Sequence, residues 1–110
     1  MSLFEKMETA TRNRDADGYI ALMADDCVFV RHQTGTQMNR AEIAEMLKRM
    51  MSSDGANLGS RRCIYENDDI LVVHSVNEYP DGTKEAVLAA YTLKDGKITR
   101  LETGATPLAS

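Results

Sequence analysis

With 110 residues, the chain has room for one domain, which we expect to span residues 1–110 and to bury a real core. Its hydrophobic fraction of 43% and charged fraction of 27% are ordinary for a soluble globular protein. The net charge of −4 argues against nucleic acid and anionic membranes as partners, because both would repel an acidic domain. No apolar run approaches the roughly 20 residues that span a bilayer. The first residues lack the features of a signal peptide, so a cytoplasmic location is expected.

Three helices are predicted from residues that cap helix N-termini. Ser2 with Glu5 forms a capping box, Asp15 caps a second helix, and Asn39 with Glu42 marks the third. Apolar residues at helical spacing follow each start. They are Leu3, Met7 and Ala10, then Tyr19, Leu22 and Met23, then Ile43, Met46, Leu47 and Met50. The first helix is expected to end near residue 13.

Strands are predicted where β-branched and alternating residues dominate. The expected strands cover 27–32, 59–66, 69–79, 84–94 and 97–104. Asp81-Gly82 and Asp95-Gly96 are strong signals of two-residue hairpin turns, and Asn67-Asp68 marks a third break. Residues 52–57 are expected to be a loop, and the tail 105–110 to be loose. Helices followed by a meander of antiparallel strands predict an α+β fold with the helices on one face of a curved sheet.

Three segments together resemble the SnoaL-like proteins of the nuclear transport factor 2-like superfamily. Residues 19–30 resemble the family's helix that ends in an acidic pair before the first strand, residues 39–47 its next helix, and residues 94–98 its final hairpin. The resemblance implies three N-terminal helices packed on a strongly curved, mainly antiparallel mixed sheet, which form a cone with one pocket. It also implies frequent homodimers through the convex sheet face. It implies no single activity, because the fold hosts isomerases, cyclases, dehydratases, epoxide hydrolases and non-catalytic binders.

One activity of the superfamily can be tested on the residues. Ketosteroid isomerase uses a tyrosine of the first helix, an aspartate base of the first strand and an aspartic acid of a later strand. In this sequence these positions align with Met7, Arg31 and Ala89. None of the three can perform the corresponding role, so a steroid isomerase of that mechanism is not expected.

The hairpins predict which residues lie side by side, because a two-residue turn fixes the register of its strands. If each break is such a turn, one row across the sheet contains Arg61, His74, Ala89 and Glu102. Because Ala89 aligns with a pocket position, this row is predicted to lie on the concave face. The same face is expected to carry Tyr91, Arg100, Val72, Val76, Val87 and Ile98. The opposite, convex face is expected to suit association.

His74 and Glu102 are the predicted catalytic residues. Two strands apart, their backbones would be separated by roughly 9–10 Å, with open space above Ala89 between them. An imidazole beside a carboxylate is a general acid–base pair, and Tyr91 or Arg100 would hold an anionic or carbonyl oxygen. The alternative is structural, because Glu102 would also pair with the nearby arginines and shape the pocket wall without chemistry.

Further residues are predicted to contact a ligand. Arg31 either binds the polar end of a ligand or neutralises Glu102, and His32 then points to the surface. Methionine-rich linings adapt to varied apolar ligands, although the same methionines also suit plain core packing. The predicted ligand-binding residues are Tyr91, Arg100, Arg31, Arg61, Tyr19, Met23, Met50 and Val72.

Cysteine, metal and cofactor patterns add little. Cys27 and Cys63 are expected to be buried thiols, and the two histidines do not form a metal site. No phosphate-binding glycine motif is present, so no cofactor is expected. Three hypotheses remain: a pocket for a small apolar-to-amphipathic molecule, an isomerase- or cyclase-like enzyme, and an association module with a vestigial pocket.

Overall fold

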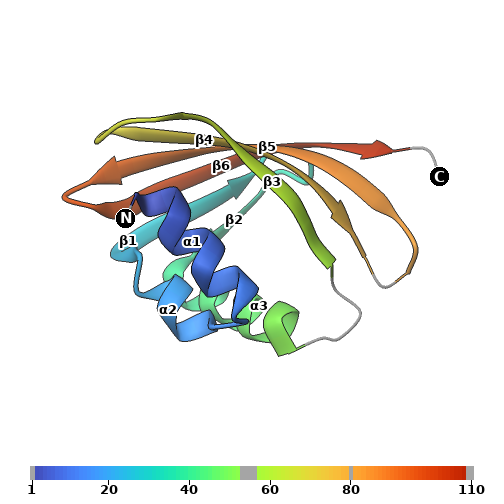
Figure 1. Ribbon diagram of the computed structural model, residues 1–110, viewed down its shortest axis with the longest axis horizontal. Helices are drawn as coiled ribbons and strands as arrows, with labels where there is room; N and C mark the ends of the chain where they lie inside the picture. The colour runs from blue at the N-terminus through green and yellow to red at the C-terminus, as the bar shows by residue number, and fades with distance from the viewer. Residues whose placement is uncertain (1, 53–56, 80, 109–110) are drawn as a thin grey trace.

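The computed structural model describes residues 2–52, 57–79 and 81–108, and these form three helices and six strands. The elements in chain order are α1 (Leu3–Arg12), α2 (Ala16–Ile20), β1 (Met23–Arg31), β2 (Thr36–Asn39), α3 (Arg40–Ser52), β3 (Asn57–Glu66), β4 (Ile70–Glu78), β5 (Lys84–Lys94) and β6 (Lys97–Leu108). The helices all lie on one side of a curved sheet (Figure 1). No helix within these ranges is long and apolar enough to cross a membrane.

The sheet has the strand order β2-β1-β6-β5-β4-β3. Strand β1 runs parallel to β6, and every other neighbouring pair is antiparallel. The sheet is not closed, because β2 and β3 are its two edges. The predicted fold class, α+β with helices on a mainly antiparallel mixed sheet, is therefore confirmed.

The predicted helix starts are confirmed by their hydrogen bonds. At α1, the Glu5 backbone N–H donates to Ser2 Oγ and the Ser2 N–H donates to Glu5 Oε1, both at 3.1 Å. The same reciprocal box stands before α3, where the Glu42 N–H donates to Asn39 Oδ1 at 2.9 Å and the Asn39 N–H donates to Glu42 Oε1 at 3.0 Å. Each box satisfies N–H groups that have no partner inside the helix.

The second helix is shorter than predicted. Asp15 caps it as expected by accepting from the Gly18 N–H at 2.9 Å. The helix ends at Ile20, however, and β1 begins already at Met23. Tyr19 of the helix and Met23 of the strand are buried in the core, and Leu22 of the turn between them is partly buried against it, so these residues do not form one helical face.

The core lies between the helices and the concave face of the sheet. Its most completely buried side chains come from both layers: Met7, Ile43, Leu71, Ile98 and Cys27. Burying a side chain of this size is worth about 1.5–3 kcal/mol, so the two layers hold each other in place.

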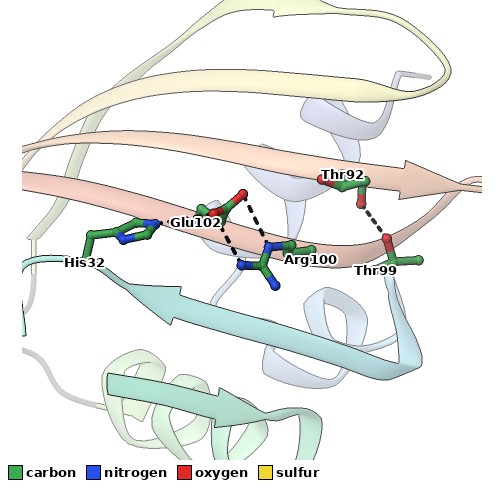
Figure 2. A network of polar contacts seen from close by, with 5 residues as sticks. All are labelled: His32, Thr92, Thr99, Arg100 and Glu102. Atoms are coloured by element: carbon green, nitrogen blue, oxygen red, sulfur yellow. Dashed lines mark hydrogen bonds and ion pairs between the residues drawn. The ribbon is translucent and has the colours of Figure 1, made fainter. Parts of the chain in front are cut away.

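The β5–β6 hairpin begins as predicted and then departs from it. Asp95 and Gly96 both have positive φ, 52° and 78°, as a type I′ turn requires. Beyond the turn Leu93 faces Ile98, but Thr92 faces Arg100, so Thr99 is an extra residue in β6. Its hydroxyl donates to the Thr92 carbonyl at 3.1 Å (Figure 2). From this bulge onward the predicted register of β6 is wrong by one residue, and its side chains point to the opposite faces.

The β4–β5 hairpin also has a register one residue away from the prediction. The hairpin is closed by the Tyr79 N–H, which donates to the Thr83 carbonyl at 2.9 Å. An odd number of residues separates these two, and of Asp81 and Gly82 only the glycine has positive φ. The turn is therefore not a type I′ turn. Instead, Asp81 Oδ1 accepts from the backbone N–H and the hydroxyl of Thr83, an Asx-type contact that holds the longer loop.

Two smaller predictions about loops also change. The β3–β4 turn lies one residue further on than predicted, because the Asn67 N–H donates to the Ile70 carbonyl and leaves Asp68 and Asp69 between them. The tail is not loose at 105–108, where β6 continues in register with β5. In the expected loop 52–57, Ser52 ends α3 and Asn57 begins β3. Residues 53–56 and 109–110 lie outside the described residues.

Replacing Asn39 by alanine removes the side chain that caps α3. We expect Asn39→Ala to lower the free energy of unfolding by about 1 kcal/mol, because a helix N–H loses its partner. Urea denaturation followed by circular dichroism measures the change. Gln37→Ala, an exposed residue of β2 with no capping role, serves as the control and should change stability by less than half as much. Equal effects of the two substitutions would contradict the capping role.

Candidate functional site

The concave face is defined by the observed register. In β4 it carries Val73 and Ser75, which pair with Ala89 and Val87 of β5. Ala89 in turn pairs with Thr103 of β6. These residues line a cavity of about 380 Å³ between the sheet and the helices. Its volume is within the range of small-molecule sites, about 300–1,000 Å³.

Most of the cavity wall is apolar and comes from the helices and from the sheet together. The apolar lining residues are Met23, Phe29, Ile43, Met46, Leu47, Met50, Met51, Val73, Val87, Ala89, Leu101 and Ala105. Four of the twelve are methionines, whose unbranched side chains fit irregular shapes. The wall therefore favours an apolar ligand body without imposing a strict outline.

One polar group of the lining is fully committed to protein contacts. Arg61 of β3 places Nε 3.2 Å from Oε1 of Glu8, and its Nη2 donates to Thr11 Oγ1 at 2.7 Å. Glu8 Oε1 is buried and accepts no hydrogen bond within the described part of the chain, so the contact is an ion pair without hydrogen-bond geometry. Arg61 thereby ties the edge strand β3 to α1.

Two tyrosines lie near this ion pair. Tyr91 of β5 and Tyr19 of α2 both line the cavity and are both buried. Burial raises the pKa of Tyr91 well above its usual range, and its neighbour Tyr19 adds to the shift in the same direction. The nearby Arg61 opposes the shift without cancelling it. Tyr91 therefore stays a neutral phenol over the physiological range and can offer a hydrogen bond but no charge.

A second polar group lies where β1, β4 and β5 approach the β4–β5 hairpin. The Tyr79 hydroxyl donates to Glu85 Oε1 at 2.9 Å, and Asn77 and Arg31 line the cavity beside them. Burial raises the pKa of Tyr79, a hydrogen bond with Asn77 lowers it, and Glu85 raises it further. The Arg31 charge lowers that pKa, so Arg31 acts on the same group.

The family model of the SnoaL-like domain matches residues 4–101. This chain belongs to the SnoaL-like domain family. No protein of curated function matches the sequence. The predicted resemblance is therefore confirmed at the level of the family.

Solved structures show the same fold for this SnoaL-like domain. It is similar to an NTF-2 like protein of unknown function from Burkholderia xenovorans (TM-score 0.80, 15% identity, covering 98% of this chain and 83% of that one). It is also similar to a hypothetical protein with a ketosteroid isomerase-like fold from Catenulispora acidiphila, in complex with trimethylamine (0.67, 14%, 93% and 83%). A third is TerC, co-crystallised with polyporic acid (0.67, 24%, 94% and 88%). At these identities the likeness shows the fold alone.

Six of the predicted site residues of this SnoaL-like domain line the cavity. They are Tyr19, Met23, Arg31, Met50, Arg61 and Tyr91. The structure does not bring the other four, Val72, His74, Arg100 and Glu102, to the lining. All four were misplaced for the same reason. Each belongs to β4 or to the part of β6 beyond the bulge, where the predicted register is wrong by one residue.

The predicted concave-face pair of His74 and Glu102 is therefore wrong. His74 faces Leu88 and Glu102 faces Ala90, so both point to the convex side of the sheet. Glu102 is also not neutralised by Arg31. It instead lies 3.3 Å from both His32 Nε2 and Arg100 Nε (Figure 2).

The predictions for His32 and for the two cysteines are confirmed in part. The expectation that His32 points to the surface is confirmed, since its side chain is 61% exposed while Arg31 lines the cavity. Cys27 is buried as predicted, but the prediction of a buried Cys63 is wrong, because this residue of the edge strand β3 is exposed. No group of three metal-ligating side chains occurs among the residues that the structure describes.

Sequence reasoning missed the polar residues beside the β4–β5 hairpin. Asn77, Tyr79 and Glu85 line the cavity but were assigned no role. The available signal was Asp81 followed two residues later by Thr83, a pattern that favours a side-chain-capped loop over a two-residue turn. The longer loop would have placed Asn77 opposite Glu85, on the concave face.

The Glu102 contacts lead to a pH prediction. Hydrogen bonds from Arg100 first, and from His32 second, lower the pKa of Glu102 below its ordinary value. A lowered carboxyl pKa means that the contact stabilises the fold above the ordinary pKa of the group and is lost as the pH falls through the lowered value. We expect Arg100→Met to raise the pKa of Glu102 in a carboxyl-detected NMR titration. Arg62→Met, an exposed arginine of β3, is the control, and an unchanged Glu102 pKa in the Arg100 variant would contradict the assignment.

Proposed function

We propose that this SnoaL-like domain binds a small, mostly apolar molecule with a polar end inside the cavity. The observation that supports this most directly is the cavity itself, about 380 Å³ in volume, with an apolar wall and a few polar groups at defined places. Ligand sites commonly have this composition, because apolar area supplies affinity and a few polar groups fix orientation. Two similar structures, with trimethylamine and with polyporic acid, also contain small molecules.

The wall composition favours ligand binding over a purely structural gap. A packed core leaves few voids larger than a water molecule, and each unfilled volume lowers stability. Here the polar side chains of Arg31 and Tyr79 share one wall with methionines. A cavity of this kind is suited to a ligand that contacts both kinds of surface.

Filling the cavity tests the proposal. Ala89 lines it and is buried on the central strand β5, so Ala89→Phe places an aromatic ring where the ligand would lie. We expect the wild-type protein to bind the neutral dye N-phenyl-1-naphthylamine with enhanced fluorescence, and Ala89→Phe to lose that binding. The substitution should cost about 1–3 kcal/mol in stability through overpacking.

The neighbouring residue provides a matched control. Leu88 lies next to Ala89 on the same strand, points to the opposite face and is 50% exposed. Leu88→Phe introduces the same ring outside the cavity, so dye binding should be retained. Dye binding that survives Ala89→Phe, or that is absent from the folded wild-type protein, would overturn the proposal of a ligand cavity.

We also propose that two copies associate through the convex sheet face. The central strands present apolar side chains there, with Val72 and Val76 of β4 beside Ala86, Leu88 and Ala90 of β5. Leu88 is half exposed at the centre of this surface. Apolar residues gathered on one face in this way are typical of association surfaces.

A single charge on the convex face tests the association. We expect the wild-type protein to be a dimer and Leu88→Glu to shift it to a monomer, because the interface would then bury an unpaired carboxylate. Sedimentation equilibrium measures the mass. Ala41→Glu adds the same charge on α3 at an exposed position in the helical layer and should leave the dimer intact. A monomeric wild-type protein, or a Leu88→Glu variant that remains dimeric, would rule out this interface.

A further inference from the structure

The two arginines that line the cavity are in different electrostatic situations. Arg61 is held by Glu8 and Thr11, at 3.2 Å and 2.7 Å. The side chain of Arg31, at the end of β1, makes no hydrogen bond or ion pair with any residue in the ranges 2–52, 57–79 and 81–108, although its backbone carbonyl accepts from the Gly35 N–H. It is nevertheless half-buried and lines the same mostly apolar wall.

A guanidinium group in such a place needs an anion. It carries five N–H donors and remains charged at every physiological pH. Partial burial against apolar side chains removes much of its water, and a charge that loses water without gaining a partner is costly. The planar fork of arginine matches a carboxylate or a similar oxyanion through two parallel hydrogen bonds.

Glu85, the acidic residue of the cavity lining, is not the anion that pairs with Arg31. Glu85 accepts the hydroxyl of Tyr79 at 2.9 Å and lies beyond ion-pair distance from Arg31, since no salt bridge joins them. Its charge opposes an incoming anion. A direct contact with Arg31 at about 2.7–2.9 Å outweighs that repulsion, because charge interactions weaken with distance.

We infer that the ligand is an amphipathic anion whose oxyanion end, a carboxylate, sulfonate or acidic enol, is bound by Arg31. Its apolar body then lies along the methionine-rich wall toward Tyr19 and Tyr91. This inference rests on the proposed function and narrows it to one chemical class. It also gives the two arginines separate roles, with Arg61 stabilising the cavity and Arg31 contacting the ligand.

A matched pair of dyes separates charge from apolar contact. 1-Anilinonaphthalene-8-sulfonate and N-phenyl-1-naphthylamine share one aromatic body, and only the first carries a sulfonate. We expect Arg31→Gln to weaken binding of the anionic dye about ten- to hundredfold, the usual worth of a charged hydrogen-bonded contact. The neutral dye should bind within about twofold of the wild-type affinity, which also shows that the variant is folded.

Three variants control the experiment. Arg62→Gln removes the same charge from an exposed residue that points to the convex side, and should change neither dye. Glu85→Gln removes the opposing charge and should strengthen binding of the anionic dye. Arg31→Lys keeps the charge but loses the fork, so its affinity for the anionic dye should lie between those of the wild type and Arg31→Gln.

The outcomes are distinguishable. If neither dye binds the wild-type protein, or if both bind equally well to Ala89→Phe, the cavity proposal fails and this inference with it. If the neutral dye binds in the cavity but the anionic dye is equally strong in the wild type, Arg31→Gln and Arg31→Lys, only the role of Arg31 is overturned. If Arg31→Gln binds neither dye, the Arg31→Lys variant decides the question. The inference then stands only if Arg31→Lys weakens binding of the anionic dye selectively.

Discussion

The hydrogen bond from the Thr99 hydroxyl to the Thr92 carbonyl holds an extra residue in β6, and the character of the cavity depends on that bulge. Beyond it, Leu101 and Thr103 point inward and line the cavity. Arg100 and Glu102, which would take those places in a regular ladder, pair with each other on the convex side (Figure 2). The one extra residue therefore places Leu101 and Thr103 in the cavity wall and the Arg100–Glu102 ion pair outside the cavity.

The sequence predicted local features well and long-range register poorly. The capping boxes at Ser2 and Asn39 need only residues three apart, so the chain itself contains the full interaction. Asp81-Gly82 is ambiguous, because a glycine with positive φ suits both a two-residue turn and a longer loop. The bulge at Thr99 has no local signal of comparable strength. Two errors of one residue each were enough to move His74 and Glu102 to the wrong face.

Six of the predicted ligand-binding residues nevertheless line the cavity, and the reason differs among them. Ala89 and Tyr91 lie on β5, whose inward face was set by the family alignment rather than by a hairpin, so the face assigned to Tyr91 survived both register errors. Arg31 was placed through that same alignment, at a position that precedes the three turns from which the register was predicted. Its role as a ligand contact is a proposal. This proposal depends on whether the charged side chain has a partner inside the fold, which a sequence pattern does not reveal.

The position of β6 in the sheet has a consequence for how the chain folds during synthesis. This strand is the last of the sheet's six strands to leave the ribosome, yet it lies between β1 and β5. Its first residues also anchor the link from α2 to β1, where the Lys97 Nζ donates to the Ala21 carbonyl and the Ile98 N–H to the Leu22 carbonyl. Until β6 arrives, β1 and β2 are separated from the β3–β5 meander, and both halves expose unpaired strand edges. The nascent chain therefore completes its sheet only after β6 has emerged, in a single late step that joins the two halves.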